Sequence, residues 1–319
     1  MKFQKTLVAV AIAGIAAVPA IASADTTLSG VVEINLFGDD TDGSDEAIGV
    51  GDVLFGIGSE NQLSSGITGY GNLRIDLDRL SNDGAVDVDN DPLTDEDDVT
   101  IGSAGTADAI FVGLKGGFGD VRFGEIPLAV EYGQVANDLF DVGAEINGGI
   151  SYTGNFGPVG LGVNVSPEGN SDQVGIGASF GIGGFSIGAG AEERNDSNNF
   201  AIGVTFAFAG ASIAAHYWVQ EDADGAIDAT ATTAAIAEDD LESFAIQVGY
   251  GFAGITAALT YATLEGDRNI QEAEQETVRL DLGYSLGGGT TLSGRLTSDT
   301  DDRANSDVVS YRIQLAKSF

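Results

Sequence analysis

Apolar residues alternate with polar or small residues along most of this chain. In the segment 276–286, for example, Val278, Leu280 and Leu282 alternate with Arg279 and Asp281. Successive residues of a strand point to opposite faces, so a period of two predicts a β-strand with one apolar face. Each such segment is roughly as long as a tilted strand that crosses a bilayer. The pattern predicts sixteen strands, at 26–37, 49–60, 66–78, 108–115, 118–124, 149–154, 158–165, 173–181, 184–192, 199–208, 211–220, 242–251, 255–264, 276–286, 290–298 and 307–319.

The connections between these segments alternate in a second way. Short turns such as Ala209-Gly210 and Ala253-Gly254 alternate along the chain with long acidic stretches such as 79–107, 125–148 and 221–240. Short turns on one side and long loops on the other are typical of outer-membrane barrels. A soluble sandwich of this size would not be expected to sort its loops in this way.

The N-terminal residues have the pattern of an export signal. Lys2 and Lys5 precede an apolar run over 7–21, and the small residues Ala22, Ser23 and Ala24 follow. This pattern predicts a signal peptide, residues 1–24, which is cleaved to leave a barrel of residues 25–319. An exported chain without a later helix anchor can still span a membrane by closing a β-barrel, in which every backbone group is paired. The fold class is therefore an all-β, antiparallel, transmembrane β-barrel.

The last predicted strand ends on an aromatic residue. Tyr311, Ile313, Leu315 and Phe319 share one parity, which Lys317 interrupts. In an outer-membrane barrel the last strand closes against the first. We therefore expect Phe319 to be the signal that the barrel-assembly machinery reads.

Charge and composition exclude several classes of protein. The chain has 13 basic and 49 acidic residues, and removing the signal leaves 13 − 2 = 11 basic residues, a net charge of −38. Such a charge repels phosphates and argues against nucleic-acid binding. Hydrophobic residues make up 43% of the chain, too many for a disordered protein, and there are no cysteines to form disulfides.

Three stretches resemble Gram-negative general porins. These are "VLFGIGSENQLSSGITGYGNL", "FVGLKGGFGDVRFGE" and "NGGISYTGNFGPVGLGV". The first is similar to the second and third strands of that family, and the others to the strands on either side of its folded-in loop. The resemblance implies a sixteen-stranded homotrimer in the outer membrane of a Gram-negative bacterium, contacting lipid and passing small hydrophilic solutes. Cations are expected as further solutes because of the acids described below. We expect no enzyme activity and no cofactor apart from the weak metal contact considered below.

The resemblance also implies that the third long loop, 125–148, narrows the pore. Apolar residues such as Leu128, Val130 and Phe140 would let this loop pack inside the barrel, and it carries no basic residue. The alternative is an ordinary surface loop with solvated acids. The predicted constriction acids are Glu125, Glu131, Asp138, Asp141 and Glu145.

A second charged group is predicted on the opposite wall. Acids on the loop and arginines on the wall would produce a transverse field, whereas a simpler role is pairing with lumen acids. In a hand alignment, Asp108, Glu125 and Glu145 occupy positions where enterobacterial porins commonly carry arginine, which predicts a cation preference. The predicted lumen-wall residues are Arg74, Asp76, Asp78, Asp108, Arg122, Arg279, Asp281, Arg295 and Arg312.

Glycines are frequent on the predicted lumen faces of strands seven to nine. We expect them to leave an open inner wall. They are Gly160, Gly162, Gly175, Gly177, Gly188 and Gly190.

Catalytic and metal sites have little support. His216 is the single histidine, and it lies beside Trp218 at a strand end, which favours an aromatic girdle or a lumen position. The stretch 87–98 has EF-hand-like acid spacing, but Pro92 replaces the turn glycine. One interpretation of this stretch is a weak calcium or magnesium contact, and the simpler alternative is a solvated loop. The acids concerned are Asp87, Asp89, Asp91 and Asp95.

Three functions from different classes follow. A general diffusion channel with a cation preference is the leading interpretation. A substrate-selective channel would show saturable block by one solute and a lumen row of aromatics. A structural or adhesive barrel would show no conductance.

Overall fold

The computed structural model describes residues 25–40, 46–64, 66–76, 107–135, 146–168, 171–194, 197–221, 240–268, 271–301 and 306–319. These residues form sixteen strands and one short 3₁₀ helix, η1 (Ala129–Tyr132). The strands are β1 (Asp25–Asp39), β2 (Ala47–Ser64), β3 (Ile67–Asp76), β4 (Ala107–Gly116), β5 (Gly119–Ile126), β6 (Ile146–Phe156), β7 (Val159–Glu168), β8 (Ser171–Ile182), β9 (Phe185–Arg194), β10 (Ser197–Phe208), β11 (Ala211–Glu221), β12 (Leu241–Phe252), β13 (Ile255–Arg268), β14 (Gln271–Gly287), β15 (Thr290–Asp301) and β16 (Ser306–Ser318).

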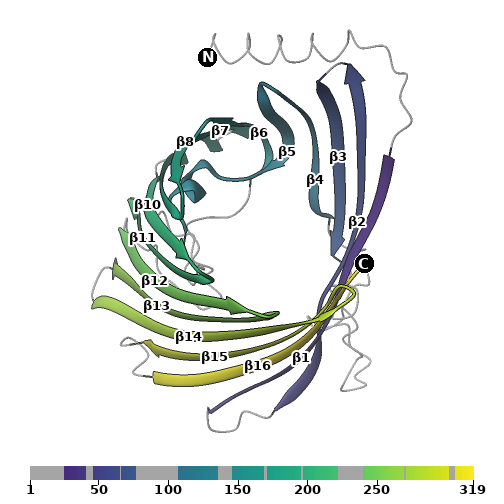
Figure 1. Cartoon of the computed structure of the whole chain (residues 1–319). Coiled ribbons are helices and arrows are strands. Elements are labelled where there is room, and N and C mark those ends of the chain that lie inside the picture. Colours follow the sequence, from purple (N-terminus) through teal and green to yellow (C-terminus); the bar gives the residue numbers. More distant parts are fainter. Residues whose placement is uncertain are drawn as a thin grey trace, which may run out of the picture.

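All sixteen strands lie where the alternation predicts them, and they form one closed barrel (Figure 1). Each strand pairs antiparallel with the next in sequence, and β16 pairs with β1 from Val31↔Ser318 to Asp39↔Ser310. Gly30 and Phe319 exchange two backbone N–H···O=C hydrogen bonds of 3.1 Å at this join. The predicted closure of the last strand against the first is therefore confirmed.

The two faces of the wall follow the predicted parity. On β10, Phe200 and Ile202 are exposed, whereas Asn199 and Ala201 are buried. Other strands repeat this arrangement, so apolar side chains cover the outside of the barrel and polar or small ones the inside. Within the described residues, no helix has the length and apolar character needed to span a membrane.

Two of the short turns use a left-handed backbone. Ala209 and Gly210 have φ of 49° and 84°, and Ala253 and Gly254 have φ of 51° and 82°. Positive φ at both central residues is the type I′ geometry, whose twist matches that of the flanking strands. Alanine is uncommon in this conformation because of its Cβ atom.

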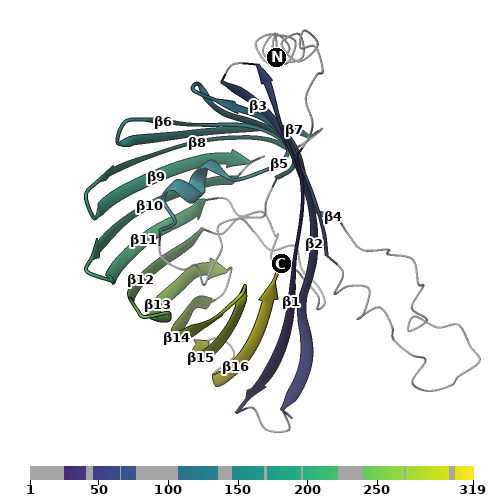
Figure 2. The same cartoon turned by 45° about the vertical axis from the view of Figure 1, so that its right-hand side comes forward.

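The segment 127–135 lies inside the barrel, against β7, β8, β9 and β10 (Figures 1 and 2). It follows β5, which ends at Ile126 rather than at 124 as predicted. Glu125 therefore belongs to a strand and not to the loop. The predicted signal peptide, residues 1–24, lies outside the described residues.

Candidate functional site

The described part of the third loop is docked on the inner wall. The backbone N–H of Ala129 donates a 2.8 Å hydrogen bond to Oδ1 of Asn164, and both groups are buried. Val130 has no exposed surface. Within the loop, the Leu128 N–H donates to Oε1 of Glu131 at 3.4 Å, which closes the first turn of η1. Burial raises the pKa of the Tyr132 phenol above its ordinary value.

An apolar cluster holds this segment in place. Ile126, Leu128 and Val130 pack with Ala201 and Trp218. Trp218 is 2% exposed and faces the interior, so of the two alternatives given for this strand end, girdle or lumen, Trp218 takes the lumen side. The sequence did carry the necessary signal, because Trp218 lies on the opposite parity to the exposed Ile213 and Tyr217.

His216 is also buried on the inner face of β11, where its cross-strand neighbours are Gly203 and Ala245. This position matches the lumen alternative of the prediction. Farther along the loop, Val135 packs against a buried cluster of Ala214, Ala245 and Ala262.

The glycine-rich wall is not open. Segment 129–133 covers the lumen faces of Gly162, Gly175, Gly177, Gly188 and Gly190, so the predicted open wall is wrong for these residues. The prediction failed because alternation shows which face a glycine is on, but not what packs against it.

A buried polar network behind the loop was missed by the sequence analysis. Gln173 donates a hydrogen bond to Glu192, which is 4% exposed. Glu192 lies across the sheet from Gly175 and Asn199. Its position on the inner parity of β9 was visible, but alternation does not show that the side chain is buried.

Three wall arginines lie side by side. Arg279, Arg295 and Arg312 are on β14, β15 and β16, and Arg295 is the register partner of both Asp281 and Arg312. We call these three residues and Asp281 the arginine wall. Asp281 accepts a hydrogen bond of 2.8 Å from Nε of Arg279 and one of 2.7 Å from Nε of Arg295. The ring order places β16 and β1 opposite β8 and β9, so the arginine wall faces the loop across the lumen.

The remaining wall arginines, Arg74 and Arg122, lie on the other side of the join between β16 and β1. Arg74 and Asp76 share the lumen face of β3 with Tyr70. Arg122 of β5 lies with its guanidinium carbon 4.2 Å from the centroid of the Phe111 ring.

Tyr70 connects Arg122 and Phe111 to further charges. Its ring lies edge-on to Phe111 with a centroid distance of 6.1 Å, and its hydroxyl donates to Asp120. Lys115 lies 5.2 Å from the Tyr70 centroid and 2.5 Å from Glu60. We call Tyr70, Phe111, Lys115, Asp120 and Arg122 the aromatic cluster. The shared parity of Tyr70 and Arg74 was the available signal for it.

Several predicted residues lie outside the described residues. They are Asp78, Asp138, Asp141, Glu145, Asp87, Asp89, Asp91 and Asp95. Asp108 lies in β4, one position before the buried Ala109, and its side chain is likewise outside the description. Among the described residues, no group of three or more His, Cys, Asp or Glu side chains is arranged to hold a metal.

A family profile for Gram-negative porins matches residues 8–310. The chain belongs to the Gram-negative porin family. Porins are channels without enzyme activity, and this one is an outer-membrane protein. A search of curated proteins found no match.

Solved porins share the fold at low sequence identity. The anion-selective porin from Comamonas acidovorans has 16% identity and a TM-score of 0.70, over 93% of this chain and 100% of that one. A loop L8 deletion mutant of OmpT from Vibrio cholerae has 13% identity and a TM-score of 0.70, over 93% and 99%. OmpF of Salmonella typhi, in complex with daunomycin, has 14% identity and a TM-score of 0.69, over 92% and 97%.

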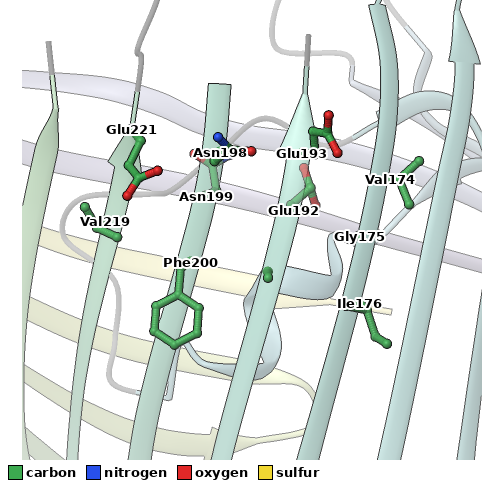
Figure 3. A pocket seen from close by; sticks show the side chains of 11 residues that line it. Val174, Gly175, Ile176, Glu192, Glu193, Asn198, Asn199, Phe200, Val219 and Glu221 are labelled. Atoms are coloured by element: carbon green, nitrogen blue, oxygen red, sulfur yellow. The ribbon is translucent and has the colours of Figure 1, made fainter. Parts of the chain in front are cut away.

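The outer surface of the porin has a groove of about 380 Å³ at one end of β8–β11 (Figure 3). Ala191 lies between Ile176 and Phe200 in the strand register, so its small side chain leaves a depression between two larger ones. Ile176 and Phe200 are exposed on the apolar outer parity. The groove is therefore part of the lipid-facing surface and not of the pore.

Proposed function

We propose that this porin is a general diffusion channel for small hydrophilic solutes and ions, and that it prefers cations. The observation that carries the proposal is the docking of segment 127–135 across the lumen from the arginine wall. A loop held in this place reduces the free cross-section, so its charges act on every solute that passes.

The charge balance supports the cation preference. The stretch 125–148 carries five acids, among them Glu125 and Glu131, and no basic residue. On the opposite side, Arg279 and Arg295 share Asp281, which offsets part of their positive charge. Charges separated by more than about 8 Å are largely screened at physiological ionic strength, so the constriction should dominate selectivity.

The test is the reversal potential of the purified protein in a planar bilayer under a tenfold potassium chloride gradient. A perfectly cation-selective pore would give about 59 mV, and we expect a potential of that sign. Glu131→Gln keeps the shape of the side chain and its hydrogen bond to Leu128, and it should move the potential toward zero. Asp281→Asn removes a charge of the same sign on the other wall and should move it in the same direction. A potential of the chloride sign in the unaltered protein would contradict the proposed preference.

The aromatic cluster favours a second candidate, a channel selective for one class of solute. Tyr70 and Phe111 offer ring surface to the lumen, and Arg122 and Lys115 lie over those rings. Such a surface suits a solute with both an apolar face and a charge. Saturable block of the potassium current by one solute, lost in Phe111→Ala, would favour this candidate over general diffusion.

We also propose that the porin is a homotrimer and that the barrel-assembly machinery recognises its last strand. OmpT of Vibrio cholerae, 13% identical to this chain with a TM-score of 0.67, has a structure of a trimer form. Conductance in steps of three and a band on unheated gels that converts to one third of its mass on boiling would support the trimer. Phe319→Ala should lower the yield of folded barrel in the outer membrane.

A further inference from the structure

A group of glycines lies beneath the docked loop, on the lumen faces of four neighbouring strands. We call this group the glycine seat. Its members are Gly162 on β7, Gly175 and Gly177 on β8, Gly188 and Gly190 on β9, and Gly203 on β10.

The loop lies so close to the glycine seat that side chains would not fit. A Cβ atom on Gly190 would lie 2.6 Å from Cα of Val130, and one on Gly177 would lie 2.8 Å from Cδ2 of Tyr132. Real Cβ atoms essentially never approach another heavy atom within 3.0 Å. Protein interiors are close-packed, so such an overlap has to be relieved by movement.

Loop backbone, rather than flexible side-chain ends, blocks other positions. A Cβ atom on Gly188 would meet the carbonyl of Tyr132, and one on Gly203 would meet the carbonyl of Gly133. The contact is reciprocal, because a Cβ atom on Gly133 would meet the backbone of Ala201. The missing side chains on both sides therefore allow backbone to lie against backbone.

The wall also fixes the loop along its length. The Ala129 N–H to Asn164 hydrogen bond and the burial of Val130 both require the close approach that the glycines permit. By contrast, Gly58 lies on the lumen face of β2, away from the loop, and a Cβ atom there would find its nearest neighbour at 3.7 Å.

We infer that the glycine seat sets the aperture of the pore. Its residues are positioning residues, because they touch the loop and not the solute. The volume of the side chains beneath the loop decides how far segment 127–135 projects into the lumen. This inference rests on the proposed function, since it requires that the docked loop bounds the conducting path.

The first experiment adds side-chain volume beneath the loop. Gly190→Ala requires the loop to retreat, because the added Cβ atom would overlap the carbonyl oxygen of Ala129 as well as Cα of Val130. The loop can only retreat into the lumen. We expect a lower single-channel conductance and a smaller cutoff for neutral polymers, with a larger loss in Gly190→Val.

Gly58→Ala is the matched control, since it adds the same methyl group to an uncrowded lumen position. Its conductance should equal that of the unaltered protein. Unchanged or raised conductance in Gly190→Ala would overturn the inference, and so would an equal loss in the control.

A second experiment tests whether the loop lies on the wall, independently of how far it projects into the lumen. A Cβ atom on Gly175 would lie 3.1 Å from Cβ of Ala129, near the roughly 3.5–4.5 Å that a disulfide spans. The chain has no cysteines, so Ala129→Cys/Gly175→Cys introduces a single possible pair. We expect it to close on oxidation, and the oxidised and reduced channels should have equal conductance because the loop is already seated.

Failure of this inference differs from failure of the proposed function. A cysteine pair that stays reduced, or a conductance that changes on oxidation, would overturn the glycine seat in a conducting protein. Absence of any conductance in the unaltered protein would refute the proposed channel. The seat would then still be tested by counting free thiols in the double variant after oxidation, since closure requires the loop to lie on the wall. Ala129→Cys alone is the control for both readouts.

Discussion

The backbone N–H of Ala129 in the third loop donates a 2.8 Å hydrogen bond to Oδ1 of Asn164 in β7. Asn164 is 1% exposed, and this bond links the loop to the wall across 35 residues of chain. A buried side-chain acceptor at this position gives the loop a specific partner that apolar packing alone would not provide.

Asn164→Leu should weaken the docking of the loop. It removes the acceptor and leaves the Ala129 N–H buried without its partner, at a cost of about 1–3 kcal/mol. We expect more frequent current fluctuations in single-channel recordings, with little change in the unfolding temperature of the whole barrel. Asn164→Asp retains an acceptor oxygen, so its current fluctuations should be as infrequent as those of the unaltered protein. Equally frequent current fluctuations in both variants would contradict the role of this hydrogen bond in holding the loop.

Asp281→Asn should destabilise the arginine wall. Arg279, which is 5% exposed, and the half-buried Arg295 would both lose their carboxylate partner, which should cost more than the roughly 0.2–1 kcal/mol of an exposed ion pair. The midpoint of heat-induced unfolding on gels should fall. Asp281→Glu keeps the charge and serves as the comparison. A midpoint unchanged in Asp281→Asn would mean that solvent in the lumen screens the two arginines.

Alkaline pH should release the loop. The pKa of Tyr132 is raised by burial in the docked state, whereas an undocked tyrosine ionises near its ordinary value of about 10. Ionisation therefore favours undocking: the docked loop has its full stability below pH 10 and loses it as the pH rises above that value. Conductance fluctuations should increase above pH 10 and should not do so in Tyr132→Phe. Identical pH profiles for the two proteins would contradict this linkage.

Ala209→Asn should stabilise the barrel. Ala209 has φ of 49°, a left-handed conformation that costs an L-residue with a Cβ atom roughly 1 kcal/mol and that asparagine tolerates better. We expect a higher midpoint of urea unfolding, by the equivalent of about 0.5–1 kcal/mol. Ala207→Gly, two residues earlier within β10, should instead lower it, because glycine weakens strand interiors. A lower midpoint for Ala209→Asn would show that the turn does not keep this geometry in the membrane.

The wall of this barrel was predictable because its signal is local and repeated. Alternation along β14 places Leu280 outside and Arg279 inside, and the same rule assigns every strand. The acids and apolar residues of the third loop likewise indicated a segment with an interior role, and the burial of Val130 agrees with that role.

What the sequence could not supply is which surfaces meet inside the lumen. Gly190 has the same local pattern whether it faces water or the backbone of Val130, and only the docked loop distinguishes the two. The same reason explains why girdle and lumen both remained open for the strand end that carries His216 and Trp218. The end of β5 was misjudged by two residues because the ladder shifts register between Gly124 and Ile126, where alternation gives no signal.

The join between β1 and β16 has a kinetic consequence. Among the described strands, every other pairing in the ring is between consecutive strands, whereas the side chains of Gln314 and Glu33 meet across 281 residues of chain, at 2.6 Å. Hairpins can therefore form one after another at small entropic cost, but the final ring closure requires the two ends of the sheet to find each other. Until that moment both edge strands expose unpaired backbone groups, which are unfavourable in lipid and prone to pairing with other chains. The half-life of this open sheet, rather than the strength of any one strand, should decide how much of the protein reaches its folded form.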